Sequence, residues 1–175
     1  MPYSRPSDFE AFRLKNDGET VAIDTSEECR VAALSMARQA ARSIEIVSRS
    51  LDPAIYDNAE FADAVSELVT GSRRARVRAL LKHTDGAVKG GHRLVAVAQR
   101  LSSFVELRVP AREYDDYNAA FLIVDRAGVI YRTLSDRYEA TVCFNNPHLA
   151  GELGRQFEAM WQTAVQDPNL RRAHL

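Results

Sequence analysis

The sequence lacks several features that mark large classes of proteins. None of its apolar runs approaches the ~18 to 20 residues that a membrane-spanning helix needs. The N-terminus, MPYSRPSDFE, lacks the apolar stretch of a secretory signal. The two cysteines, Cys29 and Cys143, belong to no CxxC or Cys/His cluster, which argues against a disulfide scaffold and a structural zinc. We therefore expect a cytoplasmic protein with no membrane insertion, no metal and no cofactor.

An excess of charge of one sign is also missing, because 23 Lys and Arg nearly balance 24 Asp and Glu. The whole molecule therefore has no strong field for nucleic acid, and any charge argument must be local. One stretch, from Gly71 to Arg93, holds seven basic residues against a single acid, Asp85. It predicts either a phosphate or nucleic-acid footprint or a solvated strand face whose charge nearby acids offset. The seven are Arg73, Arg74, Arg76, Arg78, Lys82, Lys89 and Arg93.

What is present is an alternation of helix and strand patterns. A chain of 175 residues with 46% hydrophobic content can bury one full core. Apolar residues at helical spacing predict helices over 25–43, 58–71, 94–101 and 146–164. Short apolar runs predict strands over 44–48, 77–81, 105–109, 119–124, 128–131 and 140–144. This order predicts an α/β fold with a mixed β-sheet sandwiched by helices.

Local signals mark the starts of three helices. Thr25, with Glu28 three residues on, forms a capping box. Asn58 and Asn146 are expected to cap two later helices, and Pro147 stands where a first-turn proline belongs. These side chains supply acceptors for backbone N–H groups that a helix start leaves unpaired.

The N-terminal segment is expected to be an extension of the main domain. Residues 12–15 and 20–23 flank Asp17 and Gly18, which tolerate the positive φ angles of a tight turn, so they predict a hairpin. We therefore divide the chain into an N-terminal hairpin extension (1–24), an α/β domain (25–166) and a C-terminal tail (167–175).

The segment from Asn118 to Ser135 resembles the active-site signature of the phospholipase D-like superfamily. That signature is His, any residue, Lys, four residues, Asp, then six residues and Gly-Ser-x-Asn. Asp125 holds the aspartate position, whereas Asn118 and Ala120 stand at the histidine and lysine positions. The same register places Arg132 at the glycine position and keeps a hydroxyl residue at the second and fourth positions of that element.

The resemblance implies a scaffold without its reaction. In the family the histidine forms a phosphoenzyme, and the lysine and the Gly-Ser-x-Asn groups hold the phosphoryl oxygens. Asparagine has no basic lone pair, and alanine supplies no charge, so Asn118 and Ala120 predict a catalytically inactive domain. A family enzyme also needs two signatures facing each other, so this half-sized chain implies a homodimer.

The resemblance further implies a degenerate cleft that binds a phosphate-bearing ligand. Its candidate ligand-binding residues are Ser48, Asn118, Asp125, Thr133 and Ser135. Clefts of α/β sheets lie at the carboxyl ends of strands, where Ser48 is expected. Structural roles remain open for both Ser48, as a strand-end cap, and Asp125, as a hydrogen-bonded residue after a strand.

Two alternatives come from other classes. Gly90 and Gly91 precede His92 and Arg93 at a helix start, where backbone N–H groups and these side chains are candidates for anion binding. One alternative is a hydrolase or phosphodiesterase with a relocated site, in which His92 acts as base or nucleophile beside Arg93 and Ser48. The other is a domain that contributes only a protein–protein interface. Nucleic acid is a further partner suggested by the basic stretch.

Overall fold

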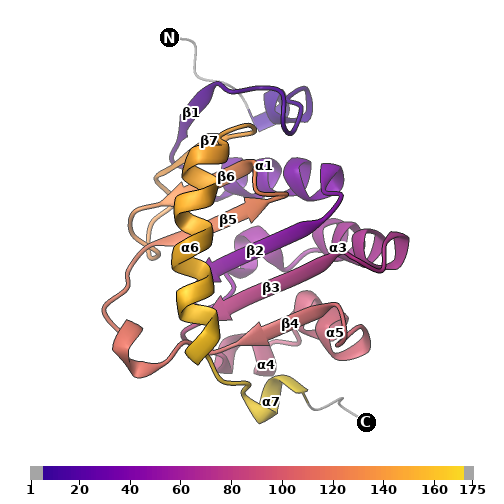
Figure 1. Ribbon diagram of the computed structural model, residues 1–175, viewed down its shortest axis with the longest axis vertical. Helices are drawn as coiled ribbons and strands as arrows, with labels where there is room; N and C mark the ends of the chain where they lie inside the picture. Colours follow the sequence, from indigo (N-terminus) through magenta and orange to yellow (C-terminus); the bar gives the residue numbers. More distant parts are fainter. Residues whose placement is uncertain (1–5, 172–175) are drawn as a thin grey trace.

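Seven short strands join into one mixed sheet in the computed structural model, which describes residues 6–171 (Figure 1). The strand order is β1-β7-β6-β5-β2-β3-β4. β2, β3 and β4 are parallel, and β5, β6, β7 and β1 add to β2 as an antiparallel half. The strands are β1 (Thr20–Ile23), β2 (Ser43–Ser48), β3 (Arg76–Leu81), β4 (Val105–Arg108), β5 (Ala120–Val124), β6 (Gly128–Arg132) and β7 (Ala140–Cys143).

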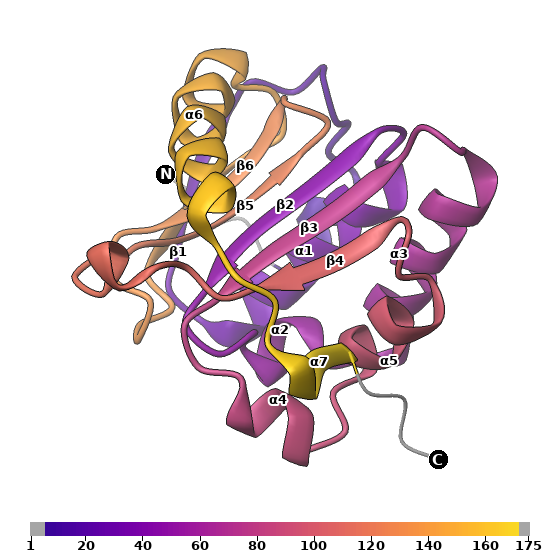
Figure 2. The same cartoon turned by 60° about the horizontal axis from the view of Figure 1, so that its bottom comes forward.

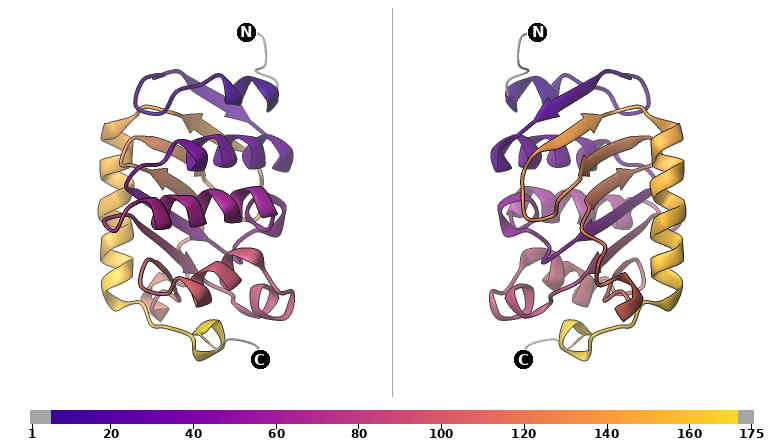
Figure 3. Two further views of the ribbon diagram at one scale, coloured as in Figure 1. Left: turned by 90° about the vertical axis from the view of Figure 1, so that its right-hand side faces the viewer. Right: turned by 90° about the vertical axis from the view of Figure 1, so that its left-hand side faces the viewer.

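Helices cover both faces of this sheet, so the predicted sandwich architecture is confirmed. Figure 3 shows α1 (Ser26–Gln39), α3 (Ala59–Gly71) and α5 (Arg93–Arg100) on one side and α6 (Pro147–Thr163) on the other. The short helices are η1 (Pro6–Glu10), α2 (Pro53–Tyr56), α4 (Asp85–Lys89), η2 (Arg112–Tyr114) and α7 (Pro168–Arg171). Figure 2 shows the chain leaving α6 and passing the end of β4 toward α7, beside α5.

Two hydrophobic cores lie on the two faces of the sheet. The larger one joins α1, α3 and α5 to the sheet, and the smaller one lies under α6. In the smaller core Phe157 stacks on Trp161, with 5.5 Å between the ring centroids. Because β5 is buried on both faces, its run of apolar residues is unbroken, as the sequence pattern predicted.

The predicted helix caps are formed. The Thr25 hydroxyl accepts the Glu28 N–H at 3.1 Å and donates to the Glu28 carboxylate at 2.8 Å. The side-chain oxygen of Asn58 accepts the Phe61 N–H at 2.8 Å. Asn146 caps α6 in the same way, through the N–H of Leu149 at 3.1 Å. Each cap stabilises its helix by about 1 kcal/mol.

The predicted N-terminal hairpin is not formed. Residues 20–23 become β1, which pairs antiparallel with β7 at the edge of the main sheet. Residues 12–15 form no strand: residues 14–16 make a turn, and Phe12 stacks on Phe144 at 5.4 Å between ring centroids. The Lys15 N–H also donates to the Phe144 carbonyl at 2.9 Å. Aromatic packing against Phe144, which follows β7, therefore takes the place of the strand pairing that Asp17 and Gly18 suggested.

None of the helices within residues 6–171 is long and apolar enough to cross a membrane.

Candidate functional site

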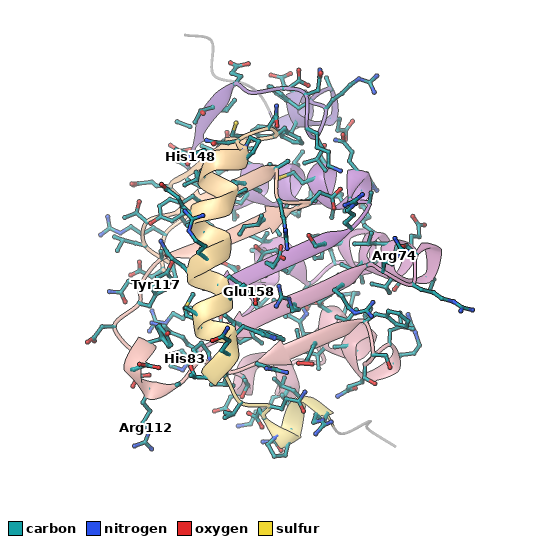
Figure 4. All side chains as sticks on the ribbon, viewed as in Figure 1. Arg74, His83, Arg112, Tyr117, His148 and Glu158 are labelled. Carbon is teal, nitrogen blue, oxygen red and sulfur yellow. The ribbon has the colours of Figure 1, made fainter. Side chains whose placement is uncertain are left out.

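Polar residues from three strands meet at one edge of the sheet. β2 and β3 are parallel and end there, and β5 begins there because it runs antiparallel to β2. A cleft of about 340 Å³ opens at this edge. Figure 4 shows His83, which follows β3, beside the lower end of α6. The cleft is lined by Arg49, Lys82, His83, Val109, Pro110, Tyr114, Asp115, Asn118 and Ser135.

Lys82 is held in the wall of the cleft by main-chain carbonyls. Its ammonium group donates to the carbonyl of Asp115 at 2.9 Å and also to that of Tyr117. Burial lowers the pKa of Lys82, and the nearby Arg49 guanidinium acts in the same direction while Asp115 opposes it. An ammonium group has three donors, so one N–H remains for a ligand after these two bonds.

Three of the predicted ligand-binding residues come together here. Asn118 and Ser135 both line the cleft, and the Ser135 N–H donates to the Asn118 carbonyl at 2.7 Å. Ser48 lies behind them in a narrow recess of about 10 Å³ that Ser135 also lines. The Ser48 hydroxyl is buried and accepts the Asp52 N–H at 3.3 Å. Ser48 therefore has the predicted structural role of capping the end of β2, and it also lies beside the cleft.

Asp125 lies at the other end of β5, away from the cleft. Its carboxylate accepts the N–H groups of Ala41, Arg42 and Ser43 at 2.8, 2.7 and 3.0 Å. Lys15 adds an ion pair at 3.0 Å. Burial opposes ionisation, but these donors together hold the pKa of Asp125 below its usual value. Asp125 thus has the structural role, and the structure does not bring it to the ligand-binding candidates.

Thr133 is exposed in the β6–β7 loop and is not among the residues that line the cleft. Its neighbour in the signature register, Arg132, is buried and organises this loop. The Arg132 guanidinium donates to the carbonyls of Arg137 at 2.7 Å and Ser135 at 2.8 Å, and lies 3.6 Å from the Asp52 carboxylate. Arg132, at the glycine position of the phospholipase D-like signature, therefore stabilises the loop that holds Ser135 at the cleft.

The structure also separates His92 and Arg93 from the cleft. His92 is buried, and its Nδ1 accepts the Leu94 N–H at 3.1 Å while its Nε2 lies 2.9 Å from the Leu51 carbonyl. Burial lowers the pKa of His92, although Asp57 opposes this shift. Arg93 pairs with Asp57 at 3.2 Å. His92 thus caps α5 with both ring nitrogens engaged, which removes the predicted base of a relocated site.

The basic stretch does not form a single surface. Arg78 lies under α6, where it contacts Glu158 and stacks over Phe157 at 4.9 Å. Arg76 covers the Phe104 ring at 5.1 Å. Within the described part of the stretch, Lys82 is the basic residue of the seven that lines the cleft. The prediction of a solvated strand face is wrong for Arg78, because α6 covers that face.

The basic character of the cleft comes from Arg49, Lys82 and His83, a combination that the sequence patterns did not single out. Arg49 directly follows β2, and Lys82 and His83 directly follow β3. Basic residues after two adjacent parallel strands are the signal that would have found them. In the described residues 6–171 no group of three or more His, Cys, Asp or Glu side chains is arranged to hold a metal ion.

Solved structures similar to this fold include TrmBL2, an archaeal chromatin protein described as having a novel mode of DNA binding. It is 17% identical with a TM-score of 0.61, and the match covers 85% of this chain and 54% of TrmBL2. This chain therefore spans about half the length of TrmBL2.

Two further solved structures match over nearly their whole lengths. Nuc from Salmonella typhimurium, a phospholipase D family member, is 19% identical with a TM-score of 0.57, and 85% of this chain and 99% of Nuc are covered. NucT from Helicobacter pylori is 10% identical with a TM-score of 0.58, with the same coverage of 85% and 99%. At these identities the likeness shows the fold alone, which is phospholipase D-like.

No curated protein matches the chain in sequence. A family model does match, over residues 25–173, which is most of the chain. The chain therefore belongs to the family described as a domain of unknown function, DUF7931.

Proposed function

We propose that this protein is a catalytically inactive phospholipase D-like domain that binds a small phosphate-bearing ligand. The observation that carries the proposal is the convergence of Arg49, Lys82 and His83 on one cleft. Asp115 is the only acid among the residues that line it. Charge-assisted hydrogen bonds to phosphate oxygens are the interactions for which such a set of donors is suited.

The remaining polar groups complete a site for oxygen atoms. The Asn118 side chain has two N–H donors, and the Ser135 hydroxyl donates one hydrogen bond. Both residues line the same cleft as Lys82. A cleft of about 340 Å³ accommodates one phosphate group and part of the molecule to which the phosphate is attached. We therefore favour a small phosphorylated molecule over an extended polymer.

Turnover is not expected, because the cleft lacks a histidine at the position of the nucleophile. Asn118 cannot form a phosphoenzyme, and Ala120 provides no charge for the transferring phosphoryl group. His83 lines the cleft, but within residues 6–171 no carboxylate lies within 4 Å of its ring to orient it. A nucleophilic or basic histidine normally has such a partner.

Calorimetric titration tests the ligand class with inorganic phosphate, a nucleoside monophosphate and a short DNA duplex as probes. We expect the small probes to bind and Lys82→Gln to weaken binding by about tenfold or more, the usual effect of losing one charge-assisted hydrogen bond. Lys89→Gln, on exposed α4 outside the cleft, is the matched control and should bind as the wild type does. Equal weakening in both variants would mean that the effect comes from the lower overall positive charge of the protein and not from a contact in the cleft.

Two further outcomes would change the proposal. Binding of the DNA duplex alone would replace the small ligand with nucleic acid, which is what TrmBL2 is described as binding. Phosphodiesterase turnover that disappears in His83→Ala would show an active enzyme. The predicted homodimer also remains a prediction, and a one-chain mass in light scattering would contradict it.

A further inference from the structure

Lys82 carries the only amine among the residues that line the cleft. The chain contains three lysines, Lys15, Lys82 and Lys89, and the rest of its Lys and Arg residues are arginines. A guanidinium stays protonated in proteins, whereas an amine becomes a nucleophile when it loses its proton. The cleft therefore contains a group that binds an anion in one protonation state and is reactive in the other.

Two main-chain carbonyls hold the Lys82 amine in both of these states. The carbonyl oxygens of Asp115 and Tyr117 each accept a hydrogen bond from Nζ, the first at 2.9 Å. A neutral amine has two N–H groups, and these two carbonyls are enough to accept both. The fourth tetrahedral position of Nζ then carries a lone pair in place of the third N–H. Loss of the proton therefore keeps both hydrogen bonds and leaves a lone pair for a ligand in the cleft.

The surroundings of Lys82 favour loss of its proton on balance. Burial is the largest influence and lowers the pKa of Lys82. Asp115 and Asp116 oppose this shift, Arg49 adds to it, and the pKa lies below its usual value. His83, the next residue, lines the same cleft. A larger fraction of this amine is thus neutral near pH 7 than of an unperturbed lysine.

Donors for a phosphate group line the same cleft as this amine. Arg49, His83 and Asn118 supply a guanidinium, an imidazole and an amide. Figure 4 shows His83 and Tyr117 on the same side of α6. A phosphate held by these donors brings the group attached to it into the cleft beside Lys82. Reactants held in one site react faster than reactants that meet by diffusion.

The space beside Lys82 favours a small group on that phosphate. The narrow recess of about 10 Å³ that contains Ser48 is lined by Lys82 as well. Its lining also includes the apolar side chains of Val47, Leu80 and Met160. A volume of this size holds a group no larger than about one water molecule, which is close to the size of a methyl group. A short acyl chain therefore fits beside the amine, and a long one does not.

We propose that Lys82 is acylated by a small acyl phosphate bound in the cleft, an inference that rests on the proposed phosphate site and names its ligand class. The neutral Nζ attacks the acyl carbon, an N–C bond forms, and the C–O bond to the phosphate breaks. Phosphate leaves with the electron pair of that bond and takes up the proton that the nitrogen loses. The reaction occurs once per chain, because the amide that forms is not nucleophilic. The uncharged product then binds phosphate more weakly, as Lys82→Gln does.

The test is incubation with acetyl phosphate in phosphate-free buffer, followed by peptide mass spectrometry that resolves the three lysines. Lys82 should be acetylated at least about tenfold faster than Lys89, which is exposed on α4 outside the cleft. Excess inorganic phosphate should remove this preference without changing the rate at Lys89. The rate at Lys82 should also level off below about pH 10.4, the pKa of an unperturbed lysine.

Three comparisons separate this reaction from the simple exposure of an amine. N-hydroxysuccinimidyl acetate, which transfers the same acetyl group but has no phosphate, should show a smaller preference for Lys82. Arg49→Gln should slow the reaction of Lys82 with acetyl phosphate by about tenfold and leave Lys89 unchanged. Lys15, which pairs with Asp125 at 3.0 Å, is a second internal reference outside the cleft.

Equal rates at Lys82 and Lys89, or a preference for Lys82 that excess phosphate does not remove, overturn the proposal. Calorimetric titration of the same sample with inorganic phosphate measures the proposed site separately. Phosphate binding with equal rates refutes the acylation alone. Absence of phosphate binding refutes the site, and the acylation with it.

Discussion

The two ends of β5 differ in how well they match the phospholipase D-like signature: the residue after the strand matches it, and the residues at its start do not. At the far end Asp125, which the signature retains, is buried and accepts three main-chain N–H groups. At the near end Asn118, which is exposed in the cleft, stands at the histidine position of the signature, and Ala120 stands at the lysine position. The comparison teaches that the aspartate has a structural role at its own end of the strand, which does not depend on the residues at the cleft end.

The largest expected effect tests the structural end of the strand. Asp125→Ala leaves the N–H groups of residues 41–43 without their acceptor between α1 and β2. Each charge-assisted bond is worth about 1.5 to 3 kcal/mol, and the losses are not additive, so we expect about 3 to 5 kcal/mol of destabilisation. Urea denaturation measures this. A loss below about 1 kcal/mol, the size of an ordinary mutational effect, would mean that the Asp125 carboxylate does not hold residues 41–43 in place.

The pH dependence of stability follows from the same carboxylate. Its pKa is lower in the folded protein than in the unfolded chain. The stability that it contributes is therefore fully present above the unfolded pKa, near 3.8, and is lost as pH falls through the lower folded pKa. The stability difference between wild type and Asp125→Asn should narrow below about pH 4. A difference that stays constant between neutral pH and strong acid would contradict this assignment.

Arg132 gives the next largest effect, because it is buried beside the cleft. Arg132→Met keeps much of the side-chain length but leaves the carbonyls of Ser135 and Arg137 without their donor. We expect about 2 to 3 kcal/mol of destabilisation, since buried polar groups lose their partners. Phosphate affinity of the folded fraction should also fall, because Ser135 loses its support. Unchanged affinity would show that the loop wall is not needed for the site.

Asp125 and the helix caps show which contacts the sequence could predict and which it could not. Caps such as Thr25 and Asn58 were predictable because donor and acceptor lie three residues apart. The partners of Asp125 lie more than eighty residues away in sequence, so only the folded chain reveals them. Its position after a strand allowed both a structural and a ligand-binding role, and spacing did not decide between them.

The candidate site shows the same limit. Ser48, Asn118 and Ser135 were placed near one another through the family resemblance and the rule for strand ends. The basic residues of the cleft follow from the strand order β5-β2-β3, which puts the ends of β2 and β3 beside the start of β5. Strand order is non-local and depends on packing of the whole sheet. The burial of His92 and its contact with the Leu51 carbonyl, at 2.9 Å, are likewise tertiary features that its place before a helix did not reveal.

The smallest expected effect on stability tests the cleft end of the strand. The Asn118 side chain is exposed, so Asn118→Ala should change the free energy of unfolding by less than about 0.5 kcal/mol. Because Asn118 lines the cleft, the same change should weaken phosphate binding by about threefold to tenfold, the effect of losing a neutral hydrogen bond. Urea denaturation and titration with inorganic phosphate measure the two quantities on one sample. Asn118→Ala and Asp125→Ala should thus separate binding from stability on a single strand, and equal stability losses in the two variants would remove the distinction between its ends.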